Sequence, residues 1–188
     1  MRVSKEQAAE NRERILDMAA KLFRERGFDG IGVADLMKSA GLTHGGFYGH
    51  FKSKEDLMAQ AAARAVDASL AGWNEVVASA GEGALAAYVD FYTSPAHRDE
   101  PGAGCIMAAL GAESARQVAP VRHALTEGVK RLFEGLSRVV PGRSAAARRE
   151  KAIVTFASLV GAMVLARVVD DETLSEEILQ VVGSTAKR

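Results

Sequence analysis

The stretch "AGLTHGGFYGHFKSKEDL", residues 40–57, decides how the front of this chain folds. Residues 43–51 hold three glycines, two histidines and three aromatic residues. Because each glycine inside a helix costs roughly 1 kcal/mol relative to alanine, a helix at this place needs other support. Thr43 is a suitable N-cap for a short helix. Ser53, with Asp56 three residues later, predicts the start of a longer helix from residue 54 towards residue 77.

The residues before this stretch predict two more helices. Ser4 and Gln7 form a possible capping box, and apolar residues then recur on one face up to the stop signal Gly27. A second short helix is expected over residues 33–39. With the helix that follows, it makes a helix-turn-helix, two short helices joined by a tight turn that contains glycine. Its predicted apolar face consists of Ala34, Leu36, Ala40, Leu42, Phe47 and Phe51.

Helical spacing also dominates the rest of the chain, where strand patterns are nearly absent. Beyond the helix from residue 54, helices are expected over residues 84–93, 105–117, 120–140, 144–169 and from residue 173 to near the end. Ser144 is the predicted cap of the helix over residues 144–169, and Thr173 with Glu176 a capping box for the last. The stretch "SPAHRDEPGAG", residues 94–104, is interpreted as a loop. The prediction is an all-α fold of nine helices, three in front and six behind.

Composition excludes several classes of protein. The 188 residues carry a formal net charge of zero, so a nucleic-acid partner would have to bind a local patch. Residues 1–54 hold ten Lys and Arg against seven Asp and Glu, a formal excess of three. The only cysteine is Cys105, which fits a reducing compartment. The longest apolar segment, residues 152–166, is shorter than the ~20 residues of a membrane span, so a soluble, cytoplasmic protein is expected.

The front of the chain is similar to the signature of the tetracycline-repressor (TetR) family. The family pattern runs Ala-Gly-Val/Leu-Ser/Thr, a Gly two residues on, Tyr-x-His-Phe, and Lys/Ser-Lys-Glu-x-Leu. The matching anchors are Gly41, Leu42, Thr43, Gly45, Tyr48, His50, Phe51, Ser53, Lys54, Glu55 and Leu57. "ILDMAAKLFRERGFDG", residues 15–30, also fits, so the resemblance covers about the first sixty residues. The chain departs from the pattern at Ile31 and Gly32, where the family usually has a capping Ser or Thr.

The resemblance implies a DNA-binding domain over residues 1–58 and an effector-binding and dimerisation domain over residues 59–188. The second helix of such a domain lies in the major groove. The expected DNA contacts are Thr43, His44, Gly45, Gly46, Tyr48, His50 and Lys54. Of these, Thr43, Tyr48, His50 and Lys54 are expected at phosphates and His44 at base edges. Gly45 would let the backbone approach DNA closely, whereas Gly46 and Gly49 remove side chains that could read bases.

The rear half is expected to bind a small-molecule effector and a second copy of the chain. Candidate effector contacts are Trp73, Tyr88, Phe91, Tyr92, Cys105, Met107, Phe133, Phe156 and Met163, with Glu113, Arg116 and His123 either orienting a ligand or solvated. Candidate dimer contacts are Phe156, Val160, Gly161, Val164, Ile178 and Val181. Small residues at 157, 161 and 162 would allow close packing of two copies. Cys105 is expected near a helix start, where a thiol is reactive, so it is either a sensor or a small core residue.

Catalysis and metal binding have little support in the sequence. His44 and His50 are six residues apart, about 120° around a helix, and do not form a chelating pair. "GAGCIM", residues 102–107, lacks the third glycine of a dinucleotide-binding loop. No metal site, cofactor or catalytic group is therefore predicted. The leading hypothesis is a homodimeric repressor that binds a pseudo-palindromic operator and is released by a small molecule. An effector-independent or activating DNA-binding protein, a regulator switched through Cys105, and a helical enzyme remain alternatives.

Overall fold

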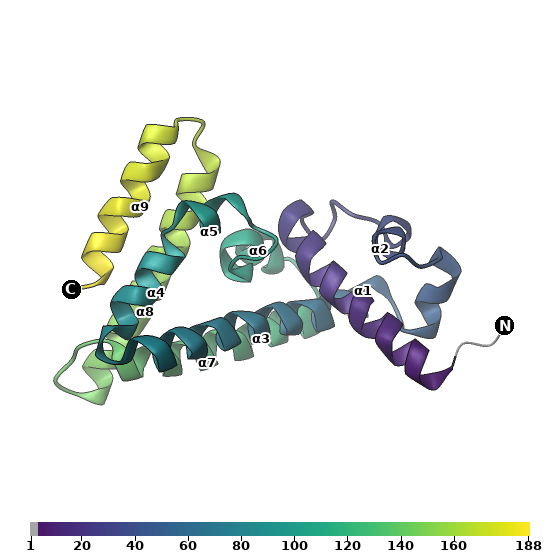
Figure 1. Ribbon diagram of the computed structural model, residues 1–188, viewed down its shortest axis with the longest axis horizontal. Coiled ribbons are helices and arrows are strands. Elements are labelled where there is room, and N and C mark those ends of the chain that lie inside the picture. The colour runs from purple at the N-terminus through teal and green to yellow at the C-terminus, as the bar shows by residue number, and fades with distance from the viewer. Residues whose placement is uncertain (1–3) are drawn as a thin grey trace.

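The structure, a computed structural model, describes residues 4–188. That part of the chain forms nine α-helices and two short 3₁₀ helices and contains no strand, which confirms the all-α prediction. The helices are α1 (Lys5–Arg26), α2 (Val33–Ser39), α3 (Lys54–Ala80), α4 (Ala84–Tyr92), α5 (Pro95–Asp99), α6 (Ile106–Ser114), α7 (Ala119–Val139), α8 (Ala145–Val168) and α9 (Glu172–Ala186); the 3₁₀ helices are η1 (His44–Gly49) and η2 (Gly81–Gly83). Figure 1 shows α1 and α2 at one end, α3 and α7 along the molecule, and α8 and α9 at the other end.

The predicted start and end of α1 are confirmed. The Ser4 hydroxyl accepts a hydrogen bond from the backbone N–H of Gln7 at 3.1 Å. The helix ends at Gly27, whose φ of +80° is easily reached only without a side chain. The apolar stripe of α1 is buried, including Ile15, Ala19, Leu22 and Phe23. This face packs on α2, α3 and α6, so α1 joins the front of the molecule to the bundle behind it.

The glycine-rich segment forms η1, a 3₁₀ helix, with Thr43 at the predicted N-cap position but without a capping hydrogen bond to its side chain. The backbone of Thr43 is extended, as at an N-cap. Bonds three residues apart, such as Gly46 N–H to the Thr43 carbonyl at 3.1 Å, replace the α-helical pattern. Burial of Phe47 and Phe51, whose ring centroids are 5.7 Å apart, anchors this otherwise weak helix.

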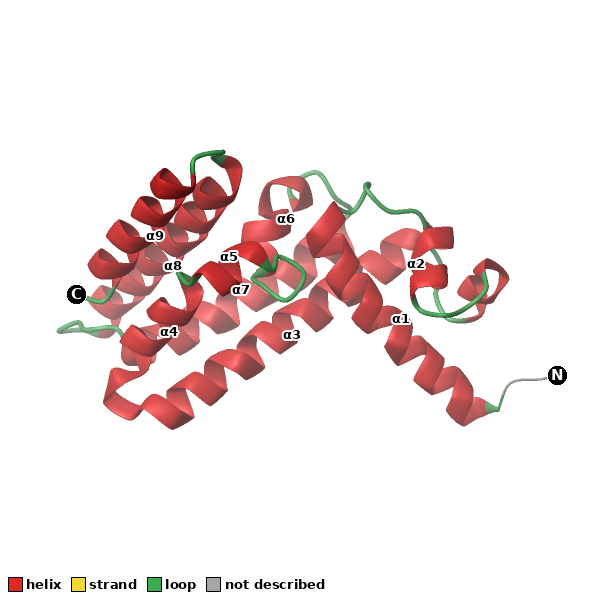
Figure 2. Ribbon diagram, turned by 45° about the horizontal axis from the view of Figure 1, so that its top comes forward, coloured by secondary structure: helices red, strands yellow, loops and turns green. Residues whose placement is uncertain are grey.

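The long helix α3 belongs to both halves of the molecule. Its predicted capping box is confirmed: the Ser53 hydroxyl accepts from Asp56 N–H at 3.2 Å, and the Asp56 carboxylate accepts from Lys52 N–H at 3.0 Å. This second hydrogen bond lowers the pKa of Asp56. Helix α3 packs on α1 near its start and on α7 along its length (Figure 2). A boundary between residues 58 and 59 would therefore fall inside one continuous helix, and it stays a prediction.

Two of the expected boundaries in the rear half are wrong. Residues 94–104 are not all loop, because the Ser94 hydroxyl accepts from His97 N–H at 3.2 Å and caps the short helix α5. The last helix begins two residues earlier than expected: Asp171, rather than Thr173, is the N-cap, and its carboxylate accepts from Leu174 N–H at 3.1 Å. The Ser144 cap of α8 is confirmed by a 3.1 Å bond from Ala147 N–H.

Helix α8 is longer than the apolar segment recognised in the sequence. Its 24 residues make it, within the described chain, the one helix whose length and composition would allow it to cross a membrane. The core helix of a water-soluble protein meets the same criterion. Helix α8 packs against α9 and α7, and its inner side, with Leu159 and Met163 fully buried, belongs to the hydrophobic core. One side of α8 thus belongs to the core, whereas Val154 and Val168 on its other side are exposed.

Candidate functional site

The first candidate site is the exposed side of the helix-turn-helix. We call residues 43–50 the reader segment. Phe47 is buried, whereas the neighbouring Tyr48 is 72% exposed, with the two rings packed edge to face at 5.2 Å. Thr43 and His44 are also exposed, and His50 is half-buried. One side of the segment thus anchors it to the core, and the other presents a phenol, an imidazole and a hydroxyl to solvent.

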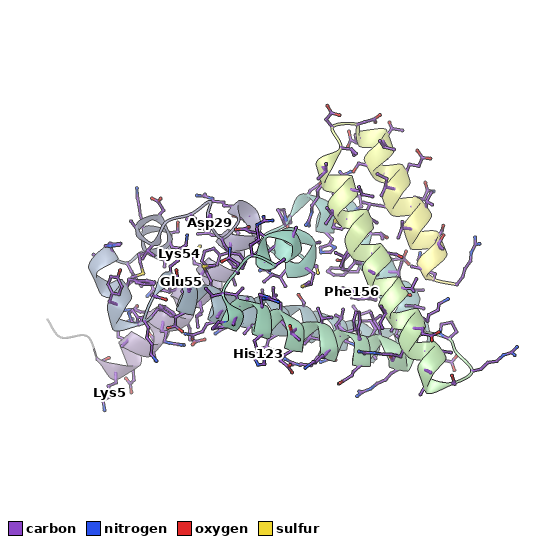
Figure 3. All side chains as sticks on the ribbon, turned by 180° about the vertical axis from the view of Figure 1, so that it is seen from behind. Lys5, Asp29, Lys54, Glu55, His123 and Phe156 are labelled. Carbon is purple, nitrogen blue, oxygen red and sulfur yellow. The ribbon has the colours of Figure 1, made fainter. Side chains whose placement is uncertain are left out.

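Lys54 extends this surface from the reader segment to the start of α3. It is the first residue of that helix and is half-buried. Figure 3 labels Lys54 and Glu55 at the same end of the molecule as Lys5, far from Phe156. The unpaired N–H groups of a helix N-terminus favour an anion, and a lysine there adds a full positive charge. Gly32, the N-cap of α2, makes no side-chain capping bond, as its lack of a hydroxyl predicts.

The glycines of the reader segment are not required by the fold of the free chain. Gly45, Gly46 and Gly49 all lack a positive φ, unlike Gly41 in the preceding turn at +70°. A Cβ added at position 45 or 49 would have no neighbour within 4 Å, and one at position 46 would make an ordinary contact with Met37 at 3.7 Å. The reason for these glycines therefore lies outside the protein's own packing.

The second candidate site is a cavity of about 820 Å³ in the rear half. That volume lies in the range of small-molecule binding sites, roughly 300–1,000 Å³. Six of the nine aromatic, sulfur-containing effector candidates line it: Trp73, Tyr88, Phe91, Tyr92, Cys105 and Phe156. Met107 and Phe133 do not line it. They border a separate depression on the α7 side, where the Arg149 guanidinium lies 4.9 Å from the Phe133 ring centroid. Met163 is fully buried core.

His97 is the polar residue of this cavity that the sequence analysis missed. It is 6% exposed, and both ring nitrogens are engaged: Nδ1 lies 2.7 Å from the Tyr92 carbonyl and Nε2 2.9 Å from Cys105 N–H. Because a carbonyl only accepts and an N–H only donates, Nδ1 carries the proton and Nε2 accepts. Burial lowers the pKa of His97, which agrees with this neutral form. The Ser94–Pro95 cap, typical of a helix start, was the signal that could have placed it.

Comparison with known proteins identifies the front of the chain. Residues 15–61 match the bacterial regulatory proteins of the tetR family. The chain carries a TetR-family DNA-binding domain. The HTH-type transcriptional regulator AcrR of Shigella flexneri is 41% identical over 59 residues, which are 31% of this chain and 27% of that protein. The repressor KstR2 of Mycolicibacterium smegmatis is 42% identical over 52 residues, 28% of this chain and 25% of that one. The matches thus span about a quarter of these relatives' length.

Solved structures extend the likeness in fold to nearly the whole chain. The reduced form of Escherichia coli NemR has a TM-score of 0.80 at 24% identity and covers 95% of both chains. A TetR transcriptional regulator from Chloroflexus aurantiacus also has a TM-score of 0.80, at 23% identity over 97% of each chain. At this level of identity the likeness concerns the arrangement of helices. The nine-helix architecture is therefore that of TetR-family structures.

The third candidate site is the outer surface of α8 and α9. Large apolar side chains at helical spacing are exposed there, which we call the α8–α9 face: Ile153, Val154, Val164, Leu165, Val168, Leu174 and Val181. Of the predicted dimer contacts, Val164, Val181 and Gly161 are exposed, and Val160 and Ile178 half-buried. Phe156 does not belong to this surface, because it is only 5% exposed and its ring faces the cavity. Ala162 likewise faces the core, whereas Ala157 is exposed.

Glu113 has a different role from the two that were considered for it. Its carboxylate neither faces the cavity nor stands free in solvent. It accepts from Phe28 N–H at 2.8 Å and Asp29 N–H at 3.3 Å, and so holds the chain between α1 and α2 onto α6. Arg116 and His123 are both exposed. A carboxylate from the rear half thus fixes a loop of the DNA-binding domain.

Proposed function

We propose that the protein is a homodimeric transcriptional repressor that binds a pseudo-palindromic operator and is released by a small molecule. The observation that carries the proposal is the reader segment, anchored by buried phenylalanines while Tyr48, His44 and Thr43 face solvent. This is the arrangement that a helix-turn-helix needs to enter a major groove. Zero net charge and a local excess of three positive charges favour moderate affinity with a strong salt dependence.

The proposed dimer rests on the α8–α9 face. Val168 is 75% exposed, and it shares its side of α8 with Val154, Gly161 and Leu165. A contiguous apolar surface of this kind typically marks an interaction site. Two copies joined there would carry two reader segments, one for each half of an inverted repeat. The cytoplasm is the compartment where such a protein meets DNA.

The proposed effector site is the aromatic cavity. Its size and its mixture of apolar walls with a few polar groups are typical of ligand sites. It also adjoins α1, since Lys21 and Arg24 line it. A ligand there would contact the DNA-binding domain directly. An effector-independent DNA-binding protein is less well supported, because a solid rear core would be expected for it.

A selection of sheared genomic DNA by the purified protein tests this function. At near-physiological salt, we expect a few enriched fragments that share an inverted repeat. The double variant Tyr48→Ala, Lys54→Ala should lose that enrichment, while Lys130→Ala on the outside of α7 should keep it. Diffuse binding that vanishes at higher salt, or unchanged affinity of the double variant, would contradict the proposal.

A second candidate function is release from DNA by modification of Cys105. The thiol lines the cavity, and Cys105 is the N-cap of α6. A small electrophile such as iodoacetamide should then release DNA from the parent protein and leave Cys105→Ser bound. Equal behaviour of the two proteins would exclude this switch.

A further inference from the structure

The cavity has one strongly polar end, formed around Gly104 and Cys105. Arg24, from α1, donates from Nη1 to the Gly104 carbonyl at 3.0 Å. Arg167, from α8, donates to the carbonyls of His97 and Arg98 at 2.6 and 2.9 Å. A Cβ on Gly104 would lie 3.2 Å from Arg167 Nη2. Arg24 therefore reaches the loop before α6, whereas Arg167 holds the end of α5 behind it and does not line the cavity.

Neither arginine has a carboxylate partner within 4 Å among the described residues. Arg24 Nε and Arg167 Nη1 are buried donors without an acceptor in that part of the chain. Burial lowers the pKa of both groups. Buried charges are normally paired, and an unpaired donor costs about 1–3 kcal/mol or more when charged. Carboxylates act on the two guanidinium groups only from beyond 4 Å: Glu25, which packs on Gly102 of the same loop, offsets part of the effect of burial on the pKa of Arg24, and Asp99 does so for Arg167.

A third unpaired donor lies at the same end. Tyr92 is 2% exposed and lines the cavity, and its hydroxyl has no hydrogen-bond partner among the described residues. Desolvation raises its pKa well above the usual value, with the nearby Cys105 thiol adding to the effect, so the hydroxyl stays protonated. His97 cannot satisfy it, because both imidazole nitrogens are already engaged. The Cys105 thiol beside the hydroxyl is a weak acceptor, so Tyr92 has no strong acceptor among the described residues.

The remaining walls are aromatic. Trp73 and Tyr88 pack edge to face at 4.7 Å, and Phe91 and Phe156 complete the lining of the same space. Glu75 is the one carboxylate among the lining residues, against the cations Lys21 and Arg24. A cationic ligand would meet like charges at the polar end, and a hydrocarbon would leave Arg24 Nε and the Tyr92 hydroxyl unsatisfied. A ligand that matches both the aromatic walls and the polar end has a flat apolar body and an anionic oxygen group.

We infer that the cavity binds a small aromatic carboxylate, its ring among the aromatic walls and its carboxylate on Arg24 and the Tyr92 hydroxyl. This inference rests on the proposed ligand response and names its chemical class. Arg24 belongs to the DNA-binding domain, so the ligand's carboxylate competes with the Gly104 carbonyl for a side chain of α1. Occupancy of the cavity then changes the contact between α1 and the loop before α6.

Trp73, the only tryptophan of the chain, reports on the site directly. Benzoate, naphthoate and biphenyl carboxylate are titrated against their three neutral amides, with Trp73 fluorescence and calorimetry as readouts. At least one carboxylate should bind about tenfold or more tightly than its own amide, the order expected for charge-assisted hydrogen bonds. Arg24→Gln and Tyr92→Phe should each remove most of that preference. Arg26→Gln, exposed on the same helix, should retain it.

Three results would overturn the inference: no carboxylate binds at millimolar concentration, the amides bind equally well, or the preference survives Arg24→Gln in a variant that melts like the parent. The test of the ligand class can fail independently of the test of the proposed function. If the protein fails to select DNA, the fluorescence titration still decides the ligand class. If it selects DNA but only neutral or cationic aromatics release it, the repressor function stands and the carboxylate class is wrong.

Discussion

Replacing Gly45 and Gly49 by alanine tests why the reader segment is rich in glycine. Neither position has a positive φ, and a Cβ at either would meet nothing within 4 Å. Alanine should therefore stabilise the free protein by about 0.4–1 kcal/mol at each site, mainly by restricting the unfolded chain. For a chain of this size, 1 kcal/mol corresponds to roughly 2–4 °C in the melting temperature. The double variant should melt about 2–8 °C higher, as measured by circular dichroism.

The affinity for the selected operator should distinguish the role of Gly45 from that of Gly49. If Gly45 lets the backbone approach a phosphate, a methyl group there removes a hydrogen bond to a charged acceptor, about 1.5–3 kcal/mol or roughly tenfold or more per reader. Because a dimer carries two readers, the loss for Gly45→Ala should approach 100-fold in fluorescence anisotropy, while Gly49→Ala stays within about threefold. Tighter binding by both variants would instead mean that glycine keeps the free segment flexible. A fall in melting temperature for either single variant would refute the structural reasoning.

Three further substitutions probe the rest of the fold. Gly128→Ala places a Cβ 2.6 Å from both Val66 methyl groups. We expect this clash to outweigh the better helix propensity of alanine and to destabilise the fold by about 1–2 kcal/mol in thermal melts. A rise in melting temperature would contradict this expectation. Val168→Asp on the α8–α9 face should halve the mass measured by light scattering, while Val118→Asp, also exposed, leaves it unchanged. Burial lowers the pKa of His97 below the value of about 6.5 that a histidine has in the unfolded chain. Below that pH the unfolded chain therefore binds more protons than the folded chain. Stability should therefore fall with pH from about 6.5 downwards, and less so in His97→Gln; parallel pH profiles would exclude this role.

Features set by neighbours in sequence were predicted well. Ser4, Ser53 and Ser144 all cap their helices as expected, because an N-cap needs only a hydroxyl and the N–H three residues on. The capping rule could not decide between two nearby candidate N-caps, Asp171 and Thr173, and the structure shows that Asp171 caps α9. The rule placed Thr43 at the right position but not its hydrogen bond, because buried phenylalanines rather than a side-chain cap hold η1 in place.

The polar end of the cavity shows why the site could be predicted only in part. Its aromatic walls were recognisable from residue type, since aromatic side chains at helical spacing are either core or ligand contacts. Arg24 and Gly104 are 80 positions apart in sequence, and nothing local to either indicates that they meet. Unpaired donors are likewise invisible in a sequence, because whether a buried group has a partner depends on every element packed around it.

Helix α5 and the loop before α6 link α1 to α8. Arg24 of α1 donates to the Gly104 carbonyl in the loop, Arg167 of α8 donates to the His97 carbonyl in α5, and the His97 ring accepts from Cys105 N–H. Gly104 fits only because it lacks a Cβ, which would lie 2.8 Å from the His97 ring. A loop packed this tightly cannot shift for one neighbour without disturbing the others. Any ligand that draws Arg24 away from Gly104 would therefore change the contacts of α1 and α8 together, which is what release of a dimer from two half-sites requires.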